Sequence, residues 1–262
     1  MNIPEHVYTS GDKNNLPVIF LHGFPYDHTM WDRQVEFLKY KYYCITYDIR
    51  GLGKNVVPDV QYTLEDLVDD LISLTENLEI RKPVICGLSM GGYICLRAIE
   101  KAQDKFSGVI LCDTKSADDD NAGRLKRAAA INAINRDGLE KYVAEAVSAT
   151  FAGETMENNR DMYEDVLRKA QSSDAAGVKA CILAMMGRTD TTGFLPEIKI
   201  PTLLISGSYD KLTPPLLMRG MCEKIPEAEL AVAPRAAHMS PLENPEFVND
   251  VISGFLDRRI EL

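Results

Sequence analysis

The sequence predicts an α/β protein in which helices cover both faces of a mostly parallel sheet. Short apolar runs alternate with helical patterns through the first half of the chain, and proline, glycine or aspartate bounds the runs. The runs are continuously apolar, which is typical of strands buried on both faces of a parallel sheet. The alternation of strand and helix places helices on both sides of that sheet.

Six apolar runs are predicted to be strands. Four lie in the first half of the chain, and two more follow a long interval without strand signals. The predicted strands cover residues 18–21, 43–47, 84–86, 109–112, 202–205 and 230–232.

The predicted helices begin at recognisable capping residues. Thr63 is followed three positions later by Asp66, a pattern typical of a helix N-terminus, and leucines then repeat at helical spacing. A second helix is expected over Ser89–Lys101. The last helix begins with Asn244 as N-cap and Pro245 at the first helical position. Its predicted apolar face is Val248, Val251, Ile252, Phe255 and Leu256.

Between about Ser116 and Gly193 the strand signals stop. Alanine, charged residues and methionine predominate there, and the apolar residues from Val178 to Met186 follow helical spacing. Because no repeat or low-complexity linker separates this stretch from the rest, we expect a helical subdomain inserted into one core. The predicted division is a core of residues 1–115 and 194–262 and a cap of residues 116–193.

Composition and charge exclude several classes of protein. The chain has 262 residues, of which 45% are hydrophobic and 26% charged, and its net charge is −10. This composition is that of a globular protein, and the negative charge disfavours nucleic acid and anionic membranes as partners. We expect the acidic run 118–120 to be a solvated loop. Oligomeric state is left open.

Cysteine usage and the N-terminal residues indicate the compartment. No pair among the six cysteines has C-x-x-C spacing, and no cluster of ligands predicts a metal or other cofactor. Residues 1–6 have neither the basic nor the apolar region of a leader, and no apolar run could span a bilayer. We therefore expect a reduced, soluble, cytoplasmic protein that needs no cofactor.

A serine in a glycine-rich turn is the strongest chemical signal. The segment Gly87–Gly92 reads G-L-S-M-G-G, follows a predicted strand and opens a predicted helix. It matches G-x-S-x-G, in which small neighbours allow a strained strand-to-helix turn that projects the serine hydroxyl above the sheet. Ser89 is therefore the predicted nucleophile.

A serine nucleophile needs a base and an acid. His238 is the only histidine after Ser89 and follows the strand at 230–232, so we expect it to be the base. Asp210, directly after the strand at 202–205, is the preferred acid. Asp113 also ends a strand and is the alternative.

Backbone N–H groups are expected to receive the negative oxygen that forms during acyl transfer. One is that of Met90, which follows the nucleophile, and the other is most simply that of Phe24, in the loop after the first strand. We expect His22 to pack that loop. The turn at 48–53 lacks the full dinucleotide fingerprint and the P-loop lysine, so we interpret it as structural.

These motifs together resemble the α/β-hydrolase superfamily over nearly the whole chain. The resemblance implies an eight-stranded, mostly parallel sheet with a helical cap after the sixth strand. Looser matches at 111–114, 184–190 and 195–198 resemble the group of 3-oxoadipate enol-lactonases, small esterases and cofactor-free haloperoxidases. The motifs that stand in the family's order are His22-Gly23-Phe24, Asp48-x-Arg50-Gly51-x-Gly53, Gly87-x-Ser89-x-Gly91-Gly92, Gly207-x-x-Asp210 and Ala237-His238.

We expect a serine hydrolase that cleaves a carboxylic ester or lactone through an acyl-enzyme, using Ser89, His238 and Asp210. Relatives that cleave epoxides or carbon–halogen bonds carry aspartate in place of Ser89, so that branch is excluded. Two alternatives remain: a carbon–carbon bond hydrolase or lyase with the same triad, and a ligand-binding receptor on this fold.

The substrate pocket is the least determined feature. No cluster of arginines is evident in the cap sequence, which favours neutral esters over di-acids. For the candidates in the cap, plain helix packing is favoured over a role in the pocket, and for Trp31 packing of the first helix is favoured more strongly. The candidates are Phe24, Trp31, Met90, Phe151, Met185, Met186, Leu212 and Met239.

Overall fold

A seven-stranded sheet organises the chain. The computed structural model describes residues 6–55 and 61–260. The strands follow the order β1-β3-β2-β4-β5-β6-β7, and every neighbouring pair is parallel except β1 with β3. The strands are β1 (Val7–Ser10), β2 (Pro17–Leu21), β3 (Tyr43–Tyr47), β4 (Val84–Leu88), β5 (Gly108–Cys112), β6 (Thr202–Gly207) and β7 (Glu229–Ala233).

The mostly parallel sheet is confirmed, but the strand count is one lower than the eight that the resemblance implies. Within the described residues, β1 is the edge strand and pairs only with β3, so no further strand lies outside it. The inserted helices consequently follow the fifth strand. Residues 1–5, on which the expectation of no leader partly rests, lie outside the described residues.

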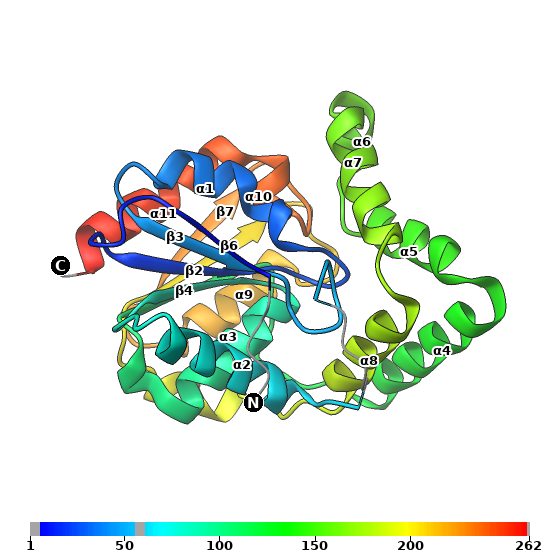
Figure 1. Cartoon of the computed structure of the whole chain (residues 1–262), viewed down its shortest axis with the longest axis horizontal. Coiled ribbons are helices and arrows are strands. Elements are labelled where there is room, and N and C mark those ends of the chain that lie inside the picture. Colours follow the sequence, from blue (N-terminus) through cyan, green and yellow to red (C-terminus); the bar gives the residue numbers. More distant parts are fainter. Residues whose placement is uncertain (1–5, 56–60, 261–262) are drawn as a thin grey trace.

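Helices cover both faces of the sheet, as predicted (Figure 1). One face carries α2, α3 and α9, and the other carries α1, α10 and α11. The short 3₁₀ segments are η1 (His28–Trp31), η2 (Gln103–Lys105) and η3 (Thr192–Glu197). The helices are α1 (Asp32–Leu38), α2 (Leu64–Asn77), α3 (Met90–Ala102), α9 (Pro215–Cys222), α10 (Ser240–Glu243) and α11 (Pro245–Arg259).

The predicted helix starts are found where the sequence placed them. Thr63 and Asp66 form the capping box of α2. The Asn244 side chain accepts a hydrogen bond from the Phe247 N–H, and Pro245 is the first residue of α11. Capping groups satisfy N–H donors that have no partner within the helix, which is why these starts can be predicted locally.

Five helices lie between β5 and β6 and form a separate group beside the sheet (Figure 1), which we call the cap helices. Within the group, α4 packs against α5 and α8, and α7 packs against α5 and α6. The cap helices are α4 (Asn121–Asp137), α5 (Leu139–Ser148), α6 (Gly153–Asn158), α7 (Arg160–Gln171) and α8 (Ala175–Met186).

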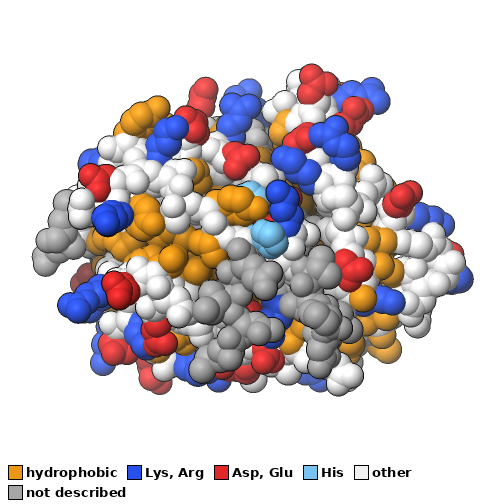
Figure 2. Space-filling model, in the orientation of Figure 1, with side chains coloured by type: hydrophobic (Ala, Val, Ile, Leu, Met, Phe, Trp, Pro, Cys, Tyr) orange, Lys and Arg blue, Asp and Glu red, His pale blue; other side chains and the backbone are white. Residues whose placement is uncertain are grey.

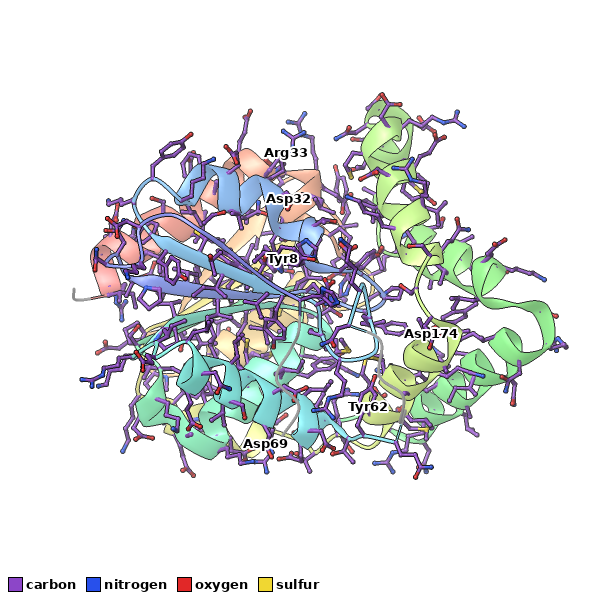
Figure 3. The ribbon with its side chains drawn as sticks, in the orientation of Figure 1. Tyr8, Asp32, Arg33, Tyr62, Asp69 and Asp174 are labelled. Carbon is purple, nitrogen blue, oxygen red and sulfur yellow. The ribbon has the colours of Figure 1, made fainter. Side chains whose placement is uncertain are left out.

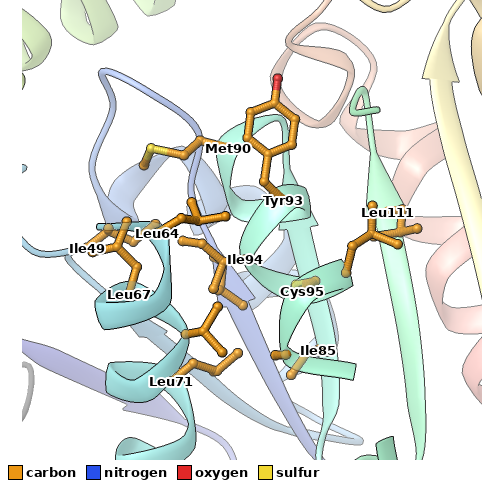
Figure 4. Packing of buried hydrophobic residues seen from close by; sticks show 14 of the residues in the cluster. Ile49, Leu64, Leu67, Leu71, Ile85, Met90, Tyr93, Ile94, Cys95 and Leu111 are labelled. Carbon is orange, nitrogen blue, oxygen red and sulfur yellow. The ribbon is translucent and has the colours of Figure 1, made fainter. Parts of the chain in front are cut away.

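Apolar side chains fill the space between sheet and helices. Figure 4 shows Leu67 and Leu71 of α2 packed in one cluster with Ile94 of α3 and Ile85 of β4. All six cysteines are free thiols, and five of them are buried. Burial of such side chains is the main stabilising contribution, at about 25 cal/mol per Å² of apolar surface.

The expectation that residues 118–120 form a solvated loop is wrong for Asp119. Its side chain is buried and forms ion pairs with Arg127 and with Arg188, which lies just after α8. Asp120 caps α4 by accepting the Gly123 N–H. A run of acids therefore contributes one buried partner and one helix cap, which charge patterning alone does not distinguish.

The surface carries acidic and basic side chains interspersed on the face that Figure 2 shows. In the described part of the chain, no helix has the length and apolar character to cross a membrane.

Candidate active site

Ser89 lies in the strained turn that the G-x-S-x-G motif predicts. It follows β4 directly, precedes α3, and has φ 52° and ψ −109°, a region that a non-glycine residue rarely adopts. Two hydrogen bonds from neighbouring segments keep Ser89 in this conformation. The Ser89 N–H donates to the Cys112 carbonyl (2.9 Å), and the Thr114 hydroxyl donates to the Ser89 carbonyl (2.7 Å). The turn is thus fixed to the end of β5.

Two positions of the motif, Gly87 and Gly91, have no room for a side chain because other backbone segments lie close to them. A Cβ at Gly87 would lie 2.4 Å from backbone atoms of Gly91, and a Cβ at Gly91 would lie 2.3 Å from the Leu21 carbonyl oxygen. Real Cβ atoms do not come this close, so the chain can cross itself here only without side chains. This is the physical reason for the glycines on either side of Ser89.

His238 and Asp210 form a buried hydrogen-bonded pair. The His238 Nδ1 lies 2.8 Å from Asp210 Oδ2, and both side chains are almost fully buried. The same carboxylate accepts the Thr213 hydroxyl (2.6 Å) and the N–H groups of Leu212 and Thr213 (2.8 and 3.1 Å). Asp210 is therefore held rigidly beside the imidazole.

Burial and pairing act in opposite directions on this pair. Burial alone would lower the pKa of His238, but the hydrogen bond and charge of Asp210, helped by the charges of Asp113 and Glu243, raise it above its usual value. Burial would raise the pKa of Asp210, yet the hydrogen bonds from His238 and Thr213 lower it overall. Pairing therefore stabilises the charged form of each partner.

Asp113 makes different contacts. Its Oδ1 accepts the Gly207 N–H (2.7 Å) and its Oδ2 accepts the Ser240 hydroxyl (2.5 Å), while Asp210 makes the hydrogen bond to His238. Burial, together with the nearby charge of Asp210, raises the pKa of Asp113 to about 8. Asp113 ties the end of β5 to the segments that carry the other two residues.

The parallel sheet brings these side chains to one edge. Strands β4, β5, β6 and β7 are consecutive neighbours, and Ser89, Asp113, Asp210 and His238 all follow their carboxyl ends. The ring of His238 bonds to Asp210 and Thr213 and not to the Ser89 hydroxyl. Such catalytic hydrogen bonds are often long until substrate binds. Residues paired across the strand ends are Leu88, Cys112 and Ile205.

The loop after β2 lies against the serine turn. A Cβ at Gly23 would meet the Ser89 Cβ at 3.5 Å and the Leu88 carbonyl oxygen at 3.4 Å, so the backbone just before Phe24 lies close to the turn. Met90 is the first residue of α3, where N–H groups have no partner within the helix.

His22 has a structural role. It is fully buried, its Nε2 accepts the Ile49 N–H (2.8 Å), and its Nδ1 donates to the Gly23 carbonyl (2.9 Å). Burial lowers the pKa of His22, in keeping with a neutral ring. Asp48, in the glycine-rich turn, accepts the N–H groups of His28 and Lys54, so its carboxylate organises the turn.

The candidate wall residues differ in position. Trp31 is fully buried and packs against Phe20 of β2, so its placement matches packing of the core. Leu212 is half exposed, and Met186 is partly exposed. The side chains that are buried or almost buried are Met90, Phe151, Met185 and Met239.

A cationic group that the sequence did not reveal lies between the cap helices and the end of β5. Lys115, Arg127 and Arg188 all form ion pairs with Asp119, so three positive charges surround one negative charge. The Arg188 guanidinium also lies 4.3 Å from the centre of the Tyr93 ring, one turn after Ser89. Lys115 and Arg127 line a hollow of about 480 Å³.

A parallel α/β sheet with a strained serine turn and an aspartate–histidine pair at its carboxyl edge defines the architecture of an α/β hydrolase. The chain belongs to the α/β hydrolase fold family, whose sequence profile matches residues 17–245. The resemblance inferred from the motifs is thereby confirmed.

Relatives cover almost the whole chain. The 3-oxoadipate enol-lactonase 1 of Acinetobacter baylyi is 30% identical over 95% of this chain and 92% of its own length. A thermophilic esterase from Thermogutta terrifontis, solved with malate bound, has a TM-score of 0.92 and 34% identity, covering 97% of this chain and 93% of that one. The enol-lactonase from Burkholderia xenovorans LB400 has a TM-score of 0.90 and 25% identity, covering 97% and 96%.

The crowding at Gly91 predicts a large loss of stability on substitution. Gly91→Ala should lower the free energy of unfolding by about 3 kcal/mol or more, because the added methyl group meets backbone that cannot move away. Gly220→Ala is the matched control: nothing lies near its Cβ, and it sits in α9. The control should gain about 0.5–1 kcal/mol. Urea denaturation measures both, and equal small changes would contradict the crowding argument.

The contacts of the two aspartates predict opposite behaviour on amide substitution. Asp210→Asn should lower kcat by about 10⁴ because the amide would hold the imidazole in the wrong tautomer. It should also lower the pKa of His238, so that the acid limb of kcat/KM moves to lower pH, since the base works in its neutral form. Asp113→Asn should change kcat by less than about tenfold. Its acid limb should move less than that of Asp210→Asn, because Asp113 contributes less than Asp210 to the raised pKa of His238. Reversed outcomes would assign the acid to Asp113.

Proposed function

We propose that the protein is a carboxylic ester hydrolase, acting on esters or lactones through an acyl-enzyme on Ser89. The observation that carries the proposal is the strained serine turn at the same sheet edge as the buried Asp210–His238 pair. Relatives that are named as enol-lactonases and esterases support the same class of reaction.

In the proposed mechanism, His238 removes the proton from the Ser89 hydroxyl as the serine oxygen attacks the substrate carbonyl carbon. Asp210 orients the ring and stabilises the imidazolium. The N–H groups of Phe24 and Met90 receive the oxyanion, a contribution worth about 2.7–4 kcal/mol per donor in another serine hydrolase. The imidazolium then protonates the leaving alkoxide.

The second half of the reaction repeats the first with water. His238 removes a proton from a water molecule, whose oxygen attacks the acyl carbon. The imidazolium then gives this proton to the Ser89 oxygen as the acyl–oxygen bond breaks, which restores the hydroxyl and releases the acid. Cleavage of a carbon–carbon bond would use the same residues on a different substrate, and a receptor would use none of them. We further propose that residues 116–193 cover the site as a cap, on a core of residues 1–115 and 194–262.

The cationic group at Asp119 bears on the class of substrate. The sequence favours neutral esters because it shows no evident cluster of arginines in the cap. In the folded chain, however, three basic side chains each form an ion pair with Asp119: Lys115, Arg127 and Arg188. Two relatives have substrates or ligands that carry carboxylates, 3-oxoadipate enol-lactone and malate. We therefore propose that esters with a carboxylate on the acyl or alcohol part are among the substrates.

Removal of the nucleophile tests the class of reaction. Ser89→Ala should lower kcat for p-nitrophenyl esters by about 10⁴ or more, because members of a triad act as a unit. A fluorophosphonate should label wild-type protein at Ser89, which mass spectrometry detects. A Ser89→Ala protein that keeps a tenth of the activity would disprove the mechanism, and wild-type protein that neither reacts nor turns over would favour a receptor.

A matched pair of substrates tests the charge preference. We expect Lys115→Gln to raise KM for monoethyl succinate about tenfold, the loss of one charge-assisted hydrogen bond, and to leave KM for ethyl butyrate unchanged. Lys101→Gln, at the far end of α3, removes the same charge away from the site and serves as control. If KM rises equally for both esters, Lys115 does not recognise a carboxylate.

A further inference from the structure

Glu243 joins the loop that carries His238 to the cap. It is the last residue of α10, and its Oε1 accepts the N–H groups of Ala237 (2.8 Å) and Met239 (3.3 Å), the two neighbours of His238. Its Oε2 accepts the Ala152 N–H (2.8 Å) and the Thr155 hydroxyl (2.7 Å), at the start of α6. One carboxylate thus bridges two segments that are about ninety residues apart in sequence.

The N–H group of His238 itself completes the attachment. It donates to the Thr150 carbonyl (2.9 Å), and the Thr150 hydroxyl lies 2.5 Å from the Tyr26 hydroxyl of the core. Three consecutive N–H groups, 237 to 239, therefore find their acceptors in Glu243 or in the segment before α6. The backbone under the imidazole belongs to no strand or helix, so these bonds determine where it lies.

We propose that Glu243 is a positioning residue that holds the His238 loop against residues 150–155, so that the imidazole and this end of the cap keep one relative position. The inference rests on the proposed function of His238 as the base. A carboxylate suits the role because it is acceptor-only with about four lone-pair sites, and all four of its partners are donors. An amide has one acceptor oxygen and can serve one of the two segments, not both.

The effect on the reaction follows from this geometry. A loop freed on one side would let the imidazole shift relative to Ser89, and a misplacement of about 1 Å can cost about 10²-fold in rate. Binding of a small ester would be little affected, because Glu243 makes its contacts with the loop and the cap segment. The charge of Glu243 also raises the pKa of His238, alongside the larger contribution of Asp210 and that of Asp113.

The experiment compares Glu243→Gln with Glu246→Gln in the full-length protein. Glu246 is exposed in the first turn of α11, so its substitution removes the same charge without these bonds. For hydrolysis of p-nitrophenyl acetate, we expect Glu243→Gln to lower kcat about 10²-fold with KM nearly unchanged. The acid limb of kcat/KM should move to lower pH, because a negative charge near the imidazole is lost. Glu246→Gln should match the wild type in all three.

Two further measurements keep the inference separate from folding and from the proposed function. Thr155→Val is nearly isosteric and removes only the hydrogen bond from the Thr155 hydroxyl to Glu243, on the cap side. A folded Thr155→Val protein with wild-type kcat would overturn the coupling to the cap. This test remains available if Glu243→Gln does not fold. NMR titration of the His238 ring, assigned with His238→Ala, needs no substrate. A folded Glu243→Gln with wild-type kcat and an unshifted His238 titration would overturn the role of Glu243. Full activity in Ser89→Ala would instead overturn the proposed function, and the titration would still test Glu243.

Discussion

The parallel pairing of β4, β5, β6 and β7 is the constraint on which the candidate site depends. Parallel neighbours end at the same edge of the sheet, so the residues that follow these strands lie at one edge: Ser89, Asp113, Asp210 and His238. This holds although all five cap helices lie between Asp113 and Asp210 in the sequence. The glycines around Ser89 serve the same constraint, since they allow α3 to pass close to the end of β2.

Three buried or partly buried carboxylates surround one imidazole, and each is held differently. Asp210 faces the ring and is kept ionised by hydrogen bonds. Asp113 is buried more deeply, which raises the pKa of its carboxyl, and it connects the segments that carry the other two residues. Glu243 accepts backbone N–H groups on either side of His238. The same type of side chain thus orients the ring, joins loops or fixes backbone, depending on the donors around it.

The cap helices and the segments that join them contact the core at several places. Residues 150–155 meet the His238 loop, and Tyr62, labelled in Figure 3, donates to the Arg50 carbonyl while lying 3.0 Å from Cys181 Sγ of α8. A further link is the cationic group at Asp119, which joins the segment after β5 to α4 and to Arg188 after α8. It is also linked to the nucleophile, because Lys115 follows Thr114, whose hydroxyl bonds to the Ser89 carbonyl. Changes in the cap can therefore reach the His238 loop and the serine turn through these contacts.

The sequence by itself determined the features that depend on neighbours along the chain. Continuous apolar runs predicted the strands, Thr63 and Asn244 predicted helix starts, and the glycines around Ser89 predicted the strained turn, because each is a matter of local periodicity, capping or sterics. The sequence favours Asp210 as the partner of His238 but does not exclude Asp113, since both follow strands at the same edge. Only the tertiary structure decided that, together with the burial of Asp119 and Trp31, the grouping of Lys115 with two arginines, and the contacts of Glu243. These depend on the packing of segments far apart in sequence, which no local pattern encodes.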